Sequence, residues 1–237
     1  MKVPELLKTL AVGELSNLFL GQEGVIEASK IPKVIQSIND GLLRLHTKFI
    51  LKEKNLILEM KAGVTFYHFK KKFAYSNYDE ANPPLQWDLP YILDMNKEPF
   101  EEDVIKVLSV YDQLGTKLPI NDLEQYNSVF TPRAEVLQVP SNVPLQMLSV
   151  EYQAKPKKIP DTDYDEEEVD LPDFLIQALR YFVGSEVYSQ MNTQENMIKG
   201  QEYSQKFEIA CQTAIDMDLA NSSSSTTNTR FEKRGWV

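Results

Sequence analysis

Apolar residues recur at three- and four-residue intervals near the start of the chain, which is the spacing of one face of a helix. After Pro4, the stretch "ELLKTLAVGELSNLFL" has this rhythm with a break near Gly13, and "GQEG" ends it. A second helix is predicted from Pro32, because proline is well tolerated in a first turn. Its apolar stripe consists of Val34, Ile35, Ile38, Leu42, Leu45 and Phe49. Both segments therefore predict helices that bury one face.

Helical spacing returns near the other end of the chain. The first stripe there consists of Leu171, Phe174, Leu175, Ala178, Leu179, Phe182, Val183 and Val187. The second consists of Tyr203, Phe207, Ala210, Cys211, Ala214 and Ile215. Asp170 stands where it would cap the first of these helices. We expect an antiparallel pair with Phe182 and Phe207 in one core and Cys211 buried.

Between these helical ends the pattern changes to the alternation and short apolar runs of strands. The stretch "NLILEMKAGVTFYHF" is predicted to form a β-hairpin that turns around Gly63. "DVIKVLSVYD", "AEVLQVP" and "MLSVEYQA" predict further strands separated by turn residues. The sequence therefore predicts an α+β fold: a helical bundle from N- and C-terminal segments, with a β-hairpin and an inserted β-rich subdomain.

This pattern divides the chain into four expected parts. Residues 1–80 hold the N-terminal helices and the hairpin, and residues 81–160 form the inserted β subdomain. Residues 161–220 contain an acidic linker and the C-terminal helical pair, and residues 221–237 form a flexible docking tail. With 237 residues, of which 42% are hydrophobic, the chain can fill a sizeable core. The single cysteine and the lack of a signal pattern or a long apolar run lead us to expect a soluble protein from a reducing compartment.

Charge is distributed unevenly. The formal net charge is −10, yet residues 30–72 hold ten Lys or Arg and three Asp or Glu, which makes that segment +7. The Lys residues of this segment have few Arg or aromatic neighbours that could contact bases, which argues against sequence-specific DNA binding. A basic segment in an acidic chain nevertheless suits the binding of an acidic partner.

The acidic run in residues 161–170 has seven carboxylates and raises the question of a metal site. Asp161, Asp163 and Asp165 match the first, third and fifth positions of a calcium-binding EF-hand loop. Such a loop needs glycine at its sixth position and a bidentate Glu at its twelfth, where this chain has Glu166 and Pro172. We therefore expect no metal here and interpret the run as a solvated linker that leads into a helix.

Catalytic constellations are lacking in the sequence. His46 and His68 have no zinc-ligand spacing, there is no glycine-rich phosphate loop, and Cys211 has no nearby base in sequence. Glu101 and Asp103 form a carboxylate pair of a kind expected by chance in a chain with 35 Asp and Glu. We expect no enzyme and no cofactor.

The order of parts nevertheless resembles one family. The run "LPINDLEQYNSVFTPRAEVLQVP", followed by "LSVEYQA", "DLPDFLIQALRYFVGSEVYS" and "GQEYSQKFEIACQ", is similar to the head-to-tail connector, or adaptor, proteins of short-tailed bacteriophages. The resemblance covers most of residues 3–215. It implies a helical bundle with an inserted β subdomain and no catalytic residues.

The resemblance also implies a function and partners. Proteins of this family form a dodecameric ring below the portal protein and continue the channel through which DNA leaves the capsid. The expected partners are further copies of the chain, the portal, and tail proteins or an adjacent ring. Phage DNA would pass through the lumen without sequence-specific binding, and no membrane is involved. The protein would belong to the neck of the virion after assembly in the host cytoplasm.

The last residues of the chain are expected to bind a partner. The stretch "RFEKRGWV" combines cations with aromatic residues, which are residue types that anchor interfaces. We expect it to bind the portal or a neighbouring ring through Arg230, Phe231, Lys233, Arg234 and Trp236.

The alternative to a connector is a cytosolic binding or regulatory module. Such a module would hold an acidic partner or nucleic acid through its basic helix and hairpin.

Overall fold

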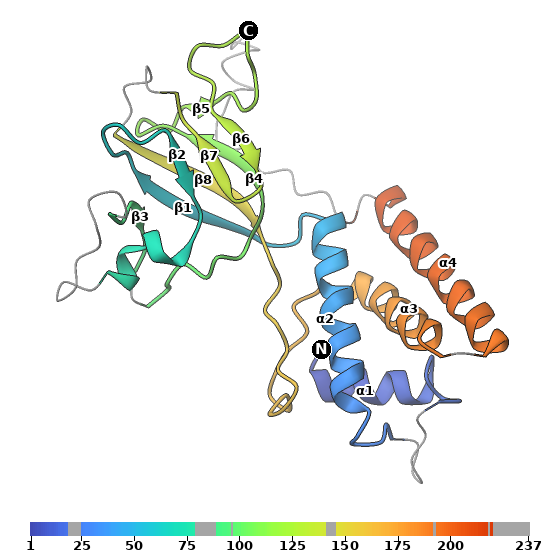
Figure 1. Cartoon of the computed structure of the whole chain (residues 1–237). Coiled ribbons are helices and arrows are strands. Elements are labelled where there is room, and N and C mark those ends of the chain that lie inside the picture. Colours follow the sequence, from blue (N-terminus) through green and yellow to red (C-terminus); the bar gives the residue numbers. More distant parts are fainter. Residues whose placement is uncertain are drawn as a thin grey trace, which may run out of the picture. The chain divides into compact units, whose positions relative to one another are not determined.

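A computed structural model describes residues 1–18, 25–78, 89–95, 97–140, 146–191, 193–217 and 219. The chain divides into two compact units. The helical unit combines Met1–Ile38 with Asp161–Val237, and the β unit, Asn39–Pro160, contains every strand among the described residues (Figure 1). The fold is therefore α+β, as the sequence predicts, with a β-rich part inserted between helical segments.

Four helices are described: α1 (Val3–Val12), α2 (Ile31–Lys48), α3 (Asp173–Ser189) and α4 (Gln194–Asp216). Helix α1 ends at Gly13, whose amide donates to the carbonyl of Thr9 at 2.9 Å, so the predicted break is confirmed. Helix α2 begins one residue before Pro32. All six residues of its predicted stripe are at most 5% exposed, which confirms the buried face.

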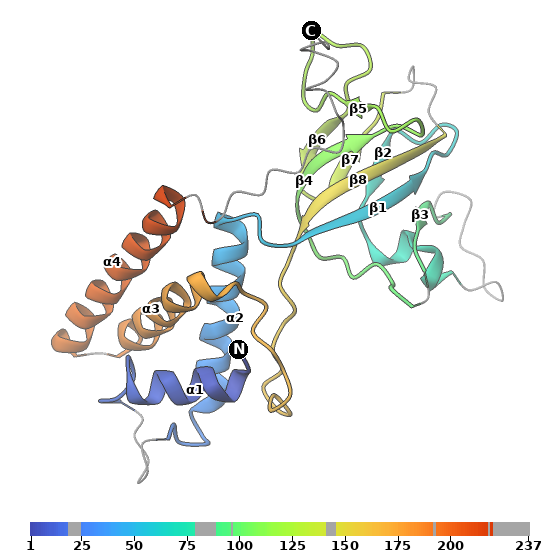
Figure 2. The same cartoon turned by 180° about the vertical axis from the view of Figure 1, so that it is seen from behind.

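Helices α3 and α4 pack against each other within the helical unit, and Figure 2 shows them side by side. Phe182 contacts Phe207 with ring centroids 5.4 Å apart, and Tyr188 contacts Tyr203 at 5.7 Å. The later residue of α3 meets the earlier residue of α4, so the two helices are antiparallel, as predicted. Cys211 is fully buried, which confirms its place in the core.

The predicted cap of α3 is wrong. Pro172, with extended backbone, precedes the first helical residue, and the acidic residue of the first turn is Asp173 instead of Asp170. Proline at this position has no side-chain oxygen to offer, and no side-chain hydrogen bond caps the helix. The helix starts here because Leu175 donates its amide to the carbonyl of Pro172 at 3.0 Å.

The β unit contains the second half of α2 and two antiparallel sheets. The five-stranded sheet has the order β3 (Ile92–Leu93), β1 (Glu53–Glu59), β8 (Met147–Ala154), β4 (Val104–Tyr111) and β5 (Lys117–Leu118). The three-stranded sheet has the order β2 (Phe66–His68), β7 (Val136–Gln138) and β6 (Phe130–Arg133). Two short 3-10 helices, η1 (Lys71–Phe73) and η2 (Tyr75–Asn77), lie between β2 and β3. Residues of both sheets share one hydrophobic core.

The predicted hairpin is wrong, because β1 and β2 belong to different sheets. β1 pairs along its whole length with β8, and β2 pairs with β7. The turn at Gly63, which has a φ of +80°, instead leads the chain from one sheet to the other. Leu58 of β1 and Tyr67 of β2 are consequently both fully buried in the shared core.

The boundary between the N-terminal part and the β unit differs from the predicted one. The β unit begins at Asn39, so both strands of the expected hairpin lie in it, whereas the sequence pattern places the division after residue 80. Pairing of β1 with β8 explains this difference, because it joins residues 53–59 to the far end of the inserted part. The second division, between residues 160 and 161, coincides with the predicted one.

Candidate functional site

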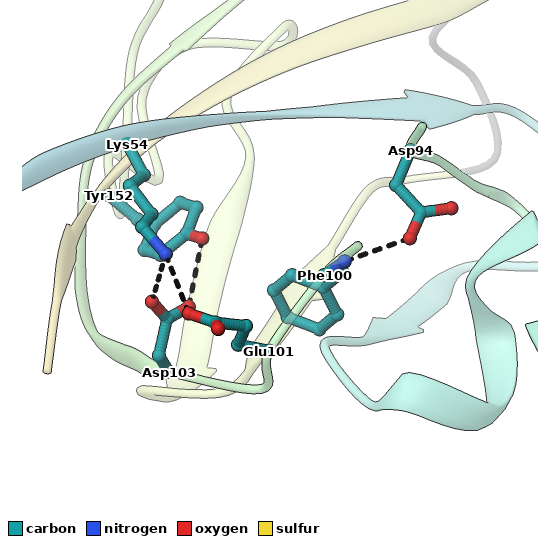
Figure 3. A network of polar contacts seen from close by, with 6 residues as sticks. All are labelled: Lys54, Asp94, Phe100, Glu101, Asp103 and Tyr152. Atoms are coloured by element: carbon teal, nitrogen blue, oxygen red, sulfur yellow. Dashed lines mark hydrogen bonds and ion pairs between the residues drawn. The ribbon is translucent and has the colours of Figure 1, made fainter. Parts of the chain in front are cut away.

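A polar network joins three elements at one end of the five-stranded sheet (Figure 3). Lys54 on β1 and Tyr152 on β8 are cross-strand partners, so their side chains share one face of the sheet. The Lys54 ammonium contacts Asp103 Oδ2 at 2.7 Å and Glu101 Oε2 at 3.0 Å. The Tyr152 hydroxyl donates to Asp103 Oδ1 at 3.0 Å. The carboxylate pair that the sequence leaves unassigned is therefore the centre of this network.

Electrostatics keep the two possible proton donors of the network protonated. Burial of Tyr152, together with the Asp103 carboxylate beside it, raises the pKa of its phenol well above the ordinary range. Burial alone would lower the pKa of Lys54, but its hydrogen bonds to Asp103 and Glu101 outweigh that effect and raise the pKa. A protonated phenol and a charged ammonium are poor bases and poor nucleophiles at neutral pH. The hydrogen bonds of Lys54 and Tyr152 to Asp103 connect β1 and β8 to the segment before β4.

An open strand edge lies next to this network. β3 covers β1 only at Ile57 and Leu58, so the earlier part of β1 has no neighbouring strand on that side among the described residues. A cleft of about 590 Å³, here called the edge cleft, borders this part of β1 and is also lined by Leu93, Phe100 and Tyr152. An unpaired edge of this kind is a site where an extended segment can add a strand.

Asp94 shapes the far wall of the edge cleft. Its carboxylate accepts hydrogen bonds from the Ser76 amide at 2.8 Å, the Ser76 hydroxyl at 2.5 Å and the Phe100 amide at 2.8 Å. Burial would raise the pKa of Asp94, but these hydrogen bonds outweigh burial and lower it. The charged carboxylate thus holds the turn that leads the chain away from β1 after β3, and Figure 3 shows its bond to Phe100.

A second cleft, of about 300 Å³, lies where four separate segments of the β unit meet. We call it the lysine cleft, and its lysines are Lys52, Lys71, Lys155, Lys157 and Lys158. Its carboxylates are Glu101, Glu102 and Asp103, of which Glu101 and Asp103 are ion-paired with Lys54. The backbone amide of Lys155 donates to the Asp103 carbonyl at 2.7 Å, which ties one wall of the cleft to the network. The cleft therefore has an excess of positive charge.

The helical unit has an acidic segment, residues 161–170, whose position is set by the N-terminus. Lys2 pairs with Glu166 at 2.7 Å, the Val3 amide donates to the Glu167 carbonyl, and the Val169 amide donates to the Met1 carbonyl. The Lys2 ammonium lowers the pKa of Glu166. The other end of the segment carries exposed carboxylates on Asp161, Asp163 and Asp165, and Glu168 in the tethered half is exposed as well. The segment is thus a tethered, negatively charged surface.

An apolar groove of about 340 Å³ also belongs to the helical unit. It lies along α1 and is lined by Leu7, Ala11, Val25, Ile26 and Ile31 together with Tyr164. Val25 is 51% exposed although it is aliphatic, so this part of the surface is apolar.

The two histidines make contacts that support the fold. His46 is 1% exposed, and its carbonyl accepts a hydrogen bond from the Gln153 side chain. The backbone amide of His68, at the end of β2, donates to the Tyr91 hydroxyl at 2.7 Å. Among the residues that the structure describes, no three His, Cys, Asp or Glu side chains are arranged to hold a metal ion. None of the described helices is long and apolar enough to cross a membrane.

The partner-binding residues predicted from the sequence, Arg230, Phe231, Lys233, Arg234 and Trp236, lie outside the described residues. Sequence reasoning identified Lys52 and Lys71 as part of a basic segment but missed the contribution of Lys155, Lys157 and Lys158 to the same cleft. The run "KPKK" was a visible signal, yet nothing local shows which other lysines it faces. Comparison with protein-family models and with curated proteins finds no match to this chain.

Proposed function

We propose that the protein is a structural component of a phage virion, a ring subunit that joins the capsid portal to the tail and continues the DNA channel. The observation that carries this proposal is the order of the two units along the chain. The β unit, Asn39–Pro160, is inserted into a helical unit formed by both ends of the chain. This is the order implied by the resemblance to connector proteins of short-tailed phages.

In this proposal, copies of the chain form a closed ring, which is a dodecamer in the family that the chain resembles. The ring binds the portal protein on one side and tail proteins or an adjacent ring on the other, and it is assembled in the host cytoplasm before it becomes part of the virion neck. Residues 230–236 supply an anchor for one of these partners. No cofactor, catalytic residue or membrane takes part.

The charge balance supports a conduit for DNA. The helical unit contains ten Lys or Arg and nineteen Asp or Glu, a formal charge of −9. Each cation that contacts a phosphate adds affinity, so a cation-rich lumen would retard the moving DNA. An acidic chain of this kind lets DNA pass without being held.

The polar network also supports a structural function. Burial and the Asp103 carboxylate raise the pKa of Tyr152, and hydrogen bonds to Asp103 and Glu101 raise the pKa of Lys54, so neither of these two side chains supplies a nucleophile or a base at neutral pH. Its hydrogen bonds connect β1, β8 and the segment before β4, which stiffens the β unit. Rigidity is what a ring subunit requires of an inserted unit.

One observation favours a second candidate function. The lysine cleft is lined by five lysines from three segments, which suits a binding module that holds an acidic partner. Such a module would act as a monomer and would bind its partner in a salt-sensitive manner. Assembly with a portal distinguishes this function from that of a connector.

The test is electron microscopy of the protein with the portal protein of the same phage. We expect negative-stain images of the mixture to show a ring with rotational symmetry attached to the portal. In parallel, Fab fragments raised against the protein should label the neck of intact virions. Unlabelled virions together with a portal that remains bare would reject the connector, and labelling elsewhere on the virion would reject its position in the neck.

A further inference from the structure

We propose that the lysine cleft of one copy binds the acidic segment, residues 161–170, of a neighbouring copy. This inference rests on the proposed ring and names a contact that closes it. The two surfaces belong to different units of the chain, so a contact of this kind is heterologous and propagates from copy to copy until the ring closes.

The cleft side of the contact is built from separate segments. Lys52 follows α2, Lys71 begins η1, and Lys155 follows β8. Lys71, Lys155 and Lys158 have exposed side chains, so the cleft presents cations to solvent. The charge of Asp103 and Glu101 is already balanced in part by Lys54, which leaves the lysines in excess. The cleft is therefore preformed and attracts an anionic group.

The acidic side is also preformed. The ion pair between Lys2 and Glu166 and the two backbone hydrogen bonds to the N-terminus fix the second half of the segment. Asp163 has a φ of +57°, a left-handed conformation that aspartate adopts more readily than most residues. Asp161, Asp165 and Glu168 remain exposed. A segment held in this way loses less conformational entropy on binding than a free peptide would.

The composition of the cleft favours a carboxylate segment over nucleic acid. No Arg lines it, and Tyr, Trp, Phe and His are missing from its described lining, so it lacks the groups that stack on bases or make bidentate contacts. The carboxylates of Glu101, Glu102 and Asp103 oppose a continuous row of phosphates. Every copy of the chain also supplies one acidic segment for each cleft, which is the stoichiometry that a ring needs.

Charge reversal tests the contact. The cleft variant carries Lys71→Glu, Lys155→Glu and Lys158→Glu, and the acidic variant carries Asp161→Lys, Asp165→Lys and Glu168→Lys. A control variant carries Lys106→Glu, Lys117→Glu and Arg133→Glu, which are exposed cations of the β unit outside the cleft and give the same change in charge. Self-association is measured by sedimentation velocity at low salt, and thermal melts confirm that each variant is folded.

We expect the cleft variant and the acidic variant each to raise the dissociation constant of self-association by about tenfold or more, while the control variant does not. Mixing the two reversed variants should restore assembly, because each reversed surface then meets an opposite charge on its neighbour. Association of the wild type should weaken as NaCl rises from about 50 to about 500 mM. Neutral versions, Asp161→Asn, Asp165→Asn and Glu168→Gln, replace the acidic variant if it does not fold.

Four results would overturn the contact: a wild type that is monomeric at every concentration, unchanged association of both variants, equal loss in the control, or mixed variants that fail to recover. Recovery only when both reversals are in one chain would assign the charges to a contact within the chain. If the cleft variant loses affinity for a DNA oligonucleotide but still self-associates, the cleft is a nucleic-acid site. Failure of this contact leaves labelling of the virion neck intact, whereas failure of the proposed function abolishes it.

Discussion

The rings of Phe182 and Phe207 meet edge to face between α3 and α4, with centroids 5.4 Å apart and planes inclined at 66°. The two residues are not equally buried, since Phe207 is 4% exposed and Phe182 is only half-buried. We predict that Phe207→Ala costs about 3–5 kcal/mol of unfolding free energy, and Phe182→Ala about half of that. Denaturant unfolding measures both. Changes near zero in both variants would mean that this contact does not hold the helices together, and equal costs would contradict the argument from burial.

The ion pair between Arg180 and Glu14 gives a second prediction. Arg180 Nη2 lies 2.9 Å from Glu14 Oε1 and its Nε lies 3.0 Å from Oε2, while the Glu14 side chain is 7% exposed. Arg180→Met leaves a buried carboxylate without its cation, so we expect a loss of about 3 kcal/mol. Adding Glu14→Gln should recover part of that loss, because the buried charge is then removed. A double variant less stable than Arg180→Met alone would contradict this account.

Tyr188 offers a stabilising substitution. It is 1% exposed, and its hydroxyl has no hydrogen-bond partner in the described part of the chain. Because an unsatisfied buried hydroxyl is costly, Tyr188→Phe should raise the unfolding free energy by about 1 kcal/mol and Tm by about 2–4 °C. The ring contacts with Tyr203 and with the Lys199 ammonium are retained by phenylalanine. A melt that falls by several degrees would show that the hydroxyl has a partner in solution.

Tyr152→Phe should lower the unfolding free energy, by an amount that depends on pH. Burial and the Asp103 carboxylate raise the pKa of Tyr152 in the folded protein. Its contribution to stability is therefore complete below the unfolded pKa of about 10, and it is lost as the pH rises through the higher folded value. The variant should be less stable than the wild type by about 1–2 kcal/mol at pH 7, and this gap should narrow between about pH 10 and 11. A constant gap in chemical denaturation across that range would disprove the assignment.

Deletion of residues 221–237 should separate assembly from folding. We expect the Tm of the isolated subunit to change little, and attachment to the portal or adjoining ring to weaken, because the aromatic and Arg side chains supply an anchor. The substitutions Phe231→Ala and Trp236→Ala should reproduce the loss, whereas shuffling residues 221–229 should not. Pull-down with the portal and counts of complete phage particles measure the effect. Full assembly by the truncated protein would show that these residues are dispensable.

The helices and longest strands were predictable because their signals are local. Five apolar positions of α2, from Val34 to Leu45, and Phe49 just after it repeat at helical spacing, and all six are buried. "MLSVEYQA" coincides with β8, since alternation along eight residues reports one buried face of a strand. Strands such as β3 and β5 have only two residues each, which is too short for any periodicity to be recognised.

The chain's own sequence thus determined its α+β class, the buried faces of α2 and of the longest strands, and the charge of its parts. Along α3 and α4, two residues of the predicted stripes, Phe174 and Ile215, are exposed. Which elements meet was decided by the tertiary structure. Periodicity shows that Leu56 and Leu58 point inward, but it does not show whether β2 or β8 lies beside them, and β8 is the partner. The same long-range pairing brings Lys54 next to Tyr152, and the path of the chain before and after the sheet gathers Lys52 and Lys155 at one cleft. Such proximity depends on core packing and on backbone hydrogen bonds between distant segments, for which a linear pattern has no signature.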